Sequence, residues 1–350
     1  MLTTITKLSG LTAPSGWEHS VREYLIEAAQ AHCLSCTVDR LGNLLILVPG
    51  KKKPKQPILL VASMDEPGFM IEEITEKGLL KFGLMGETGL RTILGRQVHA
   101  GDRGVKGVIG LKPIHLTGKE ERKTLPKAEN LYIDLGVSTK AEAENLTEVG
   151  EMGVFDQPIL FLGEYGVFGK AMERSVGCAA LLALMDEALP VDVTLAFTVQ
   201  RQVGNRGAYA LGYESPEGIA VVLELCPGDT AGEQLPKLGG GAVIPAMDAQ
   251  TIFDRELVKR LTEGANRGGA SVQLRADVPV KGDGGAIQRG GAGQRVAAIC
   301  CPADCIYAPG QRIDRRDVQQ LPKLLLGFLE EERNDRITQG ADGGVWPLRL

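Results

Sequence analysis

The sequence predicts an α/β protein in which a sheet-centred, three-layer domain is interrupted by a small β-rich domain. Continuous apolar runs at 44–48 and 58–62 are typical of strands that are buried on both faces of a sheet. Between about Gly68 and Leu162 the pattern changes to short β-type runs separated by glycines. We therefore expect residues 1–67 and 163–350 to form the α/β domain, with residues 68–162 inserted into it.

Apolar spacing places the individual elements. A first helix is predicted between Glu18 and Gln30, because Val21, Tyr24, Leu25 and Ala28 recur at helical spacing. The inserted segment contains short β-type runs at 69–74, 79–84, 97–100, 105–109 and 131–135. One helix is predicted in it, at 139–146. Strands and helices then alternate again, with strands at 193–199, 219–225 and 296–300 and helices at 175–189, 254–265 and 314–331.

Composition limits the classes of function. The net charge is −5 (39 basic minus 44 acidic residues), and the one lysine run, Lys51–Lys53 with Lys55, indicates a solvated hairpin tip rather than a nucleic-acid surface. No apolar stretch approaches about 18 residues, so we expect no membrane partner. Seven cysteines, an odd number, and an N-terminus without a signal-peptide pattern predict reduced thiols in a cytoplasmic protein.

Imidazole and thiol ligands for a metal ion are scarce. The chain has four histidines, at His19, His32, His99 and His115, and none follows residue 162. Cys33 and Cys36 form a C-x-x-C motif, but a zinc or redox site would need further ligands, such as Cys300, Cys301 or Cys305. Two half-buried thiols at a helix-to-strand junction are the simpler interpretation.

Several segments match one family in the same order along the chain. They are Leu11–Glu18, Asp39–Leu44, Gly107–Leu116 and Tyr132–Gly136, and further matches continue to about residue 310. Together they resemble the tetrahedral aminopeptidases, also called the glutamyl-aminopeptidase or cellulase-M-like family. The resemblance implies an aminopeptidase-like α/β domain with a β-barrel-like insert, and assembly into dimers and often dodecameric shells. It also implies removal of N-terminal residues by two metal ions and a glutamate base.

The family's metal-binding motifs are altered in this sequence. The histidine of the family's A-H-M-D-E-x-G motif corresponds to Ser63, whereas Asp65, which orients that imidazole in the family, is retained. The bridging aspartate of the K-A-x-D motif corresponds to Glu173. A further ligand aspartate corresponds to Glu224, and the last ligand histidine corresponds to Tyr307.

The general base is altered as well. In the stretch that matches Q-E-E-V-G-x-R-G-A, the base glutamate corresponds to Arg201 and the neighbouring ligand glutamate to Gln202. Hydroxyl and amide groups are poor zinc ligands, and arginine stays protonated. We therefore expect no bound metal and no catalytic residue. We expect Arg201 to take roughly the place of the metal ions and to pair with Glu173 or Glu224. Arg174 would assist it in the pocket or lie on a helix surface.

Three functions remain open on the sequence alone. The leading hypothesis is a non-catalytic structural, regulatory or peptide-binding subunit, in a homo-oligomer from dimer to dodecamer or together with an active paralogue. The second is an active metallo-aminopeptidase with zinc or cobalt. Its rebuilt metal site would draw on Glu173, Glu224, Asp283 and one of the cysteines Cys178, Cys226 or Cys305, although packing explains these cysteines and helix capping explains Asp283. The third is a glycoside hydrolase that uses Glu173 and Glu224 as paired carboxylates.

Overall fold

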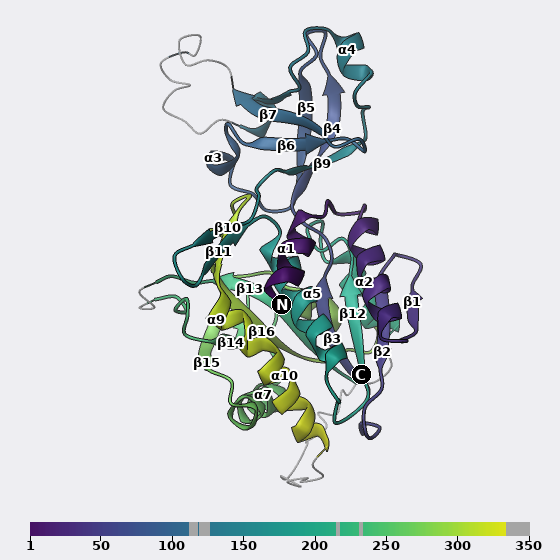
Figure 1. Cartoon of the computed structure of the whole chain (residues 1–350), viewed down its shortest axis with the longest axis vertical. Coiled ribbons are helices and arrows are strands. Elements are labelled where there is room, and N and C mark those ends of the chain that lie inside the picture. The colour runs from purple at the N-terminus through teal and green to yellow at the C-terminus, as the bar shows by residue number, and fades with distance from the viewer. Residues whose placement is uncertain (112–117, 119–126, 215–217, 231–233, 334–350) are drawn as a thin grey trace, which may run out of the picture.

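The computed structural model describes residues 1–111, 118, 127–214, 218–230 and 234–333. It consists of a larger α/β unit and a barrel at the top of Figure 1. The barrel strands fall between β3 and β10 in the chain, so the polypeptide leaves the larger sheet once and returns to it. The exact domain limits given above stay a prediction. The strand β10, at Leu160–Leu162, falls inside the predicted insert, but it pairs with β11 of the larger sheet.

The larger unit is built on an eleven-stranded mixed sheet. Its main path runs β1-β2-β12-β3-β13-β16-β17-β11-β10, and β14 and β15 branch from β16. The central strands β12, β3, β13 and β16 are mutually parallel, which suits their nearly complete burial. The strands are β1 Cys36–Val38, β2 Leu44–Val48, β3 Ile58–Ser63, β11 Gly166–Gly169, β12 Val193–Thr198, β13 Ile219–Pro227, β14 Ala242–Asp248, β15 Val272–Val278, β16 Arg295–Asp304 and β17 Gln311–Asp314.

Helices cover both faces of this sheet because successive strand side chains point to opposite sides. Leu60 and Leu223 join the core on one face, while Leu59 and Val222 join the core on the other. The first face is covered by α1 Leu2–Gly10, α2 His19–Ala31, α5 Met172–Leu182, α7 Arg255–Gly268 and α10 Gln320–Arg333. The second is covered by the short helices α6 Arg206–Glu214 and α8 Gly284–Gln288.

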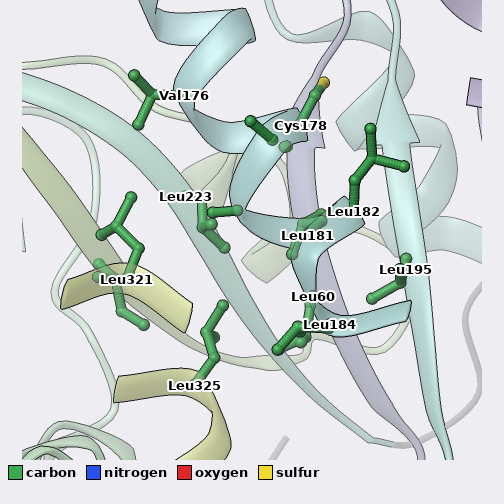
Figure 2. Packing of buried hydrophobic residues seen from close by; sticks show 14 of the residues in the cluster. Leu60, Val176, Cys178, Leu181, Leu182, Leu184, Leu195, Leu223, Leu321 and Leu325 are labelled. Atoms are coloured by element: carbon green, nitrogen blue, oxygen red, sulfur yellow. The ribbon is translucent and has the colours of Figure 1, made fainter. Parts of the chain in front are cut away.

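The larger core is dominated by leucine and valine. Figure 2 shows Val176 and Leu181 of α5 among Leu60 and Leu223 of the central strands, with Leu321 and Leu325 of α10 nearby. Full burial of each such side chain is worth about 1.5–3 kcal/mol. Because helices pack on both faces of the sheet, the predicted three-layer arrangement is confirmed.

The barrel closes in the order β4-β5-β8-β7-β6-β9 and has its own apolar core. Its strands are β4 Gly68–Ile74, β5 Leu80–Met85, β6 Gln97–Ala100, β7 Val105–Leu111, β8 Leu131–Asp134 and β9 Met152–Phe155. The helix α4, Lys140–Glu144, begins with a capping box in which Thr139 and Glu142 exchange hydrogen bonds. A short helix, α3 at Leu90–Ile93, lies on the rim of the barrel.

Some predicted elements differ from the structure. The fifth helix begins at Met172 rather than Ser175, which places Glu173 in its first turn. The last predicted helix is divided at Gln319 into α9, Arg315–Val318, and α10. The lysine run does not form a hairpin tip, because β12 lies between β2 and β3 in the sheet.

Candidate active site

The candidate residues gather at the carboxyl ends of the parallel strands, where open α/β sheets usually bind ligands. Ser63 ends β3, and Glu224 lies in the second half of β13. Arg201 follows the end of β12 by three residues. Glu173 lies in the first turn of α5, where the helix dipole favours a carboxylate.

Arg201 is the centre of this group. Its Nη2 atom lies 2.7 Å from Oε1 of Glu173 and 2.8 Å from Oε2 of Glu224. The Arg201 side chain is 10% exposed, and those of Glu173 and Glu224 are 16% and 4% exposed. One guanidinium nitrogen therefore bridges the two carboxylates in a nearly dry environment. The predicted ion pairing of Arg201 is present with both partners.

Two further acids surround the bridge. Asp65 accepts hydrogen bonds through Oδ2 from the Ser15 hydroxyl and from the backbone N–H of Gln202, the latter at 2.9 Å. Asp283 accepts one through Oδ2 from the Thr198 hydroxyl at 2.5 Å. Oδ1 of each aspartate is buried without a hydrogen-bond partner among the described residues. Two of these four carboxyl groups pair with the guanidinium directly, and Asp65 and Asp283 act on it electrostatically.

The pKa shifts show how this surplus of acids is tolerated. Burial, with a contribution from Glu224, raises the pKa of Glu173 to about 8 against the opposing effect of Arg201. Burial and Glu224 likewise raise the pKa of Asp283 to about 7. Burial alone would lower the pKa of Arg201, but Glu173 and Glu224 outweigh it and the net shift is upward. Retained protons on the acids therefore bring the cluster closer to neutrality.

A cavity of about 330 Å³ opens onto the bridge. Glu173, Arg201, Gln202 and Tyr307 are among the residues that line it. Tyr307 is 46% exposed, and its hydroxyl donates to the carbonyl oxygen of Pro279 at 3.2 Å rather than pointing at the glutamates. Ser63 is buried and does not line the cavity.

Arg174 does not assist Arg201, and it is not on a helix surface. Its side chain is fully buried, 3.4 Å from Oε1 of Glu66, and it donates to the carbonyl oxygens of Leu8 and Leu11, each at 3.0 Å. Lys170 joins the same buried group and contacts Glu66 at 2.7 Å. These hydrogen bonds anchor the end of α1 to Arg174. The side chain is not on a helix surface because nearly every residue of α5 is buried, which leaves the helix without a solvent face.

Of the other predicted ligands, Asp283 lies in the acid cluster, where its backbone N–H donates to Oε1 of Glu224 at 2.8 Å, and the cysteines are dispersed. Asp283 precedes α8, but its side chain makes no capping hydrogen bond, so the capping interpretation was wrong. Cys178 and Cys226 are buried in the core, and Cys305 is exposed. Cys33 and Cys36 lie beyond the end of α2, where His32 pairs with Asp186 at 2.9 Å. In the described part of the chain no three His, Cys, Asp or Glu side chains are placed to hold a metal ion, and His115 lies outside that part.

Unusual backbone conformations concentrate around the site. Five described non-glycine residues have φ between 52° and 61°: Cys33, which lies away from the site, and Ala171, Gln200, Asn205 and Cys305. Ala171 and Gln200 directly precede Met172 and Arg201, and Asn205 and Cys305 flank the cavity loops. Such left-handed backbone costs free energy in non-glycine residues, and it is common at functional sites.

Several residues of the site carry no recognisable signal in the sequence. Ser15 and Thr198 reach the two aspartates only through the fold. Glu87, from the barrel, pairs with Lys281 at 2.7 Å at the mouth of the cavity. These pairs join residues that are 50 to 194 positions apart in the chain, so local pattern could not predict them.

Comparison with known proteins agrees with this architecture. The sequence model of the M42 glutamyl aminopeptidases matches residues 42–324. FrvX of Escherichia coli K12 is 30% identical over 338 residues, which cover 93% of this chain and 94% of FrvX.

Solved structures give the same result. The aminopeptidase APDkam598 of the archaeon Desulfurococcus kamchatkensis is 31% identical, covers 93% of each chain and superposes with a TM-score of 0.85. The TET1 peptidase of Pyrococcus horikoshii, described as assembling into a tetrahedron or a large octahedral shell, is 28% identical with a TM-score of 0.84, over 94% of this chain and 98% of that one.

Among the described residues, none of the helices has the length and apolar character that a membrane span requires.

Proposed function

This chain belongs to the M42 glutamyl aminopeptidase family, and we propose that it is a non-catalytic member that binds peptides or serves as a subunit of an assembly. One observation carries the proposal: Nη2 of Arg201 lies within 2.8 Å of carboxylate oxygens of both Glu173 and Glu224. A permanent cation of the protein itself stands between these two glutamates.

The residues present do not fit a pair of divalent ions. The carboxylate oxygens of Glu173 and Glu224 that would face the ions are already paired with Arg201. Ser63 and Gln202 offer only a hydroxyl and an amide, and the Tyr307 hydroxyl is bonded to Pro279. Zinc prefers imidazole, thiolate or carboxylate, and a guanidinium repels any cation placed beside it.

A general base is also missing at the position where the family resemblance places it. Arg201 occupies that position, and the carboxylates around it raise its pKa further. It therefore stays protonated and cannot accept a proton from water. Loss of a general base alone lowers rates by about 10²–10⁴-fold.

The cavity itself supports binding without hydrolysis. Its volume of about 330 Å³ is within the range of ligand pockets and suits the end of a short peptide. Glu173 and Gln202 on its wall offer hydrogen-bonding groups, and the Glu87–Lys281 pair lies at its mouth. Relatives that build tetrahedral shells support a homo-oligomer, from dimer to dodecamer, or an assembly with an active paralogue.

An active metallo-aminopeptidase is the second candidate, because a similar solved structure is described as an aminopeptidase. It would need zinc or cobalt in a rebuilt site on Glu173, Glu224 and Asp283. In the structure Arg201 would first have to leave the space between the glutamates, at the cost of unpaired buried carboxylates.

A glycoside hydrolase with Glu173 and Glu224 as paired carboxylates is less favoured. The pKa of Glu173, raised to about 8 by burial, would suit a general acid. However, the space between the two carboxylates, where a scissile bond would have to lie, is filled by Arg201.

The test is a peptidase assay on the intact protein with a panel of amino-acid anilides and short peptides, with and without added zinc or cobalt. We expect no turnover above that of the Glu173→Gln variant, while peptides still bind in calorimetry. Metal-dependent turnover that Glu173→Gln abolishes would establish the second candidate instead. The same variant controls for contaminating peptidases, whose activity it would leave unchanged.

A further inference from the structure

A second cavity lies between the barrel and the larger unit. Its volume is about 430 Å³, and its walls are the segment Arg91–Arg96 of the barrel rim, Phe168 of β11 and the turn at 305–310 between β16 and β17. Figure 1 shows α3, which contains Arg91, on the edge of the barrel that faces β10 and β11. Ligand sites occur preferentially at such junctions between units, and this volume is in their usual range.

The cavity is basic although the protein as a whole is acidic. Arg91 and Arg96 line it, and no aspartate or glutamate does. The Arg96 guanidinium is held in place, since Nε donates to the carbonyl oxygen of Thr92 at 3.0 Å and Nη1 to Oε1 of Gln157 at 3.3 Å. The exposed side chain of Arg91 makes no hydrogen bond or ion pair with the described part of the chain.

An acid beside the cavity does not neutralise these arginines. Asp304 adjoins the cavity residue Cys305, but its Oδ2 accepts from Nη2 of Arg312 at 3.0 Å and its Oδ1 accepts from the backbone N–H of Cys305 at 2.8 Å. The Arg91 guanidinium and the remaining N–H groups of Arg96 are therefore available to an external partner. Guanidinium binds carboxylate and phosphate oxygens with paired, charge-assisted hydrogen bonds.

The two cavities share one wall. Ile306 and Tyr307 line the first, whereas Cys305 and Ala308 line the second. A hydrogen bond of 2.9 Å from the backbone N–H of Gly89 to the carbonyl oxygen of Tyr307 ties this wall to the barrel. Glu173 and Arg201 of the acid-rich cluster line the first cavity, whereas the arginines Arg91 and Arg96 line the second, so the two sites differ in charge.

We propose that the second cavity is an oxyanion-binding site, in which Arg91 and Arg96 hold a carboxylate or phosphate group. The carboxylates of an acidic peptide and inorganic phosphate offer the same chemistry. In the described part of the chain, no residue that lines this cavity makes a hydrogen bond or ion pair with Glu173 or Glu224, so the proposal can be tested separately from the bridge at Arg201.

The experiment is titration calorimetry of the full-length protein with two probes, inorganic phosphate and a tetraglutamate peptide, at low salt. The variants are Arg91→Gln, the double variant Arg91→Gln/Arg96→Gln, and Arg103→Gln as control. Arg103 is an exposed arginine of the same barrel outside the cavity, so it matches the charge change. Arg91→Gln breaks no described contact and keeps the test valid if the double variant does not fold.

We expect at least one probe to bind, and its affinity to fall by about tenfold for Arg91→Gln and further for the double variant, because each lost charge-assisted contact weakens binding by about this factor or more. Arg103→Gln should bind as the parent does. Binding of phosphate alone or of peptide alone supports the site and identifies its source of oxyanion. No binding of either probe, or binding that Arg91→Gln leaves unchanged, overturns the proposal.

Discussion

At the scale of single residues, the pocket depends on balancing buried charge. Arg201 pairs directly with Glu173 and Glu224, and burial raises the pKa of Glu173 to about 8 and that of Asp283 to about 7. A buried carboxylate that loses its partner is strongly destabilising, whereas a fully paired group costs little. Arg201 is therefore expected to matter for stability even if the protein performs no catalysis.

Replacement of Arg201 by Met should lower the free energy of unfolding by about 3–5 kcal/mol, because it leaves Glu224 buried without a cation and removes the guanidinium partner of Glu173. Arg201→Lys should cost less, since it keeps the charge but loses the planar fork. Urea denaturation monitored by circular dichroism measures both. Equal stability of Arg201→Met and the parent would contradict the charge-balance account.

The raised pKa values predict how stability depends on pH. Glu173, with a pKa of about 8 instead of 4.5, holds a proton in the folded state that the unfolded chain has already released between these values. The folded state therefore binds more protons in this window, and stability falls as pH rises through it.

The Glu173→Gln variant tests this dependence. It removes one strongly shifted acid and leaves Asp283 and Asp317, whose pKa values are raised to about 7 and about 6, so its loss of stability between about pH 5 and pH 8 should be smaller than that of the parent. Glu23→Gln, on the exposed side of α2, serves as control and should keep the parent slope. A steeper loss in Glu173→Gln would show that the shift has the opposite sign.

At the scale of elements, the helix pair α7 and α10 depends on glycines. A Cβ atom at Gly264 would lie 2.6 Å from the backbone nitrogen of Phe328, and one at Gly327 would overlap the carbonyl oxygen of Gly264. The two backbones thus approach more closely than any side chain permits. Ion pairs from Arg260 to Glu332 and from Arg267 to Glu331 flank the contact.

Gly327→Ala should separate these helices and lower stability by about 1–3 kcal/mol, the usual cost of overpacking. Gly10→Ala is the matched control, because no atom lies within 4 Å of its Cβ position and alanine is the better helix former there. Thermal denaturation of both variants compares them. The close-approach argument fails if Gly327→Ala melts at or above the temperature of Gly10→Ala.

At the scale of the whole molecule, the sequence predicted the parts that local pattern encodes. The parallel strands β3 and β13 are continuous apolar runs, and burial on both faces is the reason. The helix α6 was missed because it is short and contains glycines, which are poor helix formers, whereas the equally short α8 was expected only from the capping role given to Asp283. They are held in place by packing on the sheet rather than by their own propensity.

The site was predictable only in part for a similar reason. The positions of Glu173, Arg201 and Glu224 followed from motifs, and the sequence correctly paired them. Arg174 was misplaced because the sequence does not reveal that α5 is buried nearly all round. The barrel residue Glu87 and its partner Lys281 meet only once both units are folded.

The measurement that tests the central claim most directly is the metal content of the intact protein by elemental analysis. The protein would be incubated with excess zinc or cobalt and then desalted without chelator. If Arg201 stands in place of the metal ions, the bound metal should remain far below one ion per chain. Two ions per chain that Glu173→Gln removes would contradict the account.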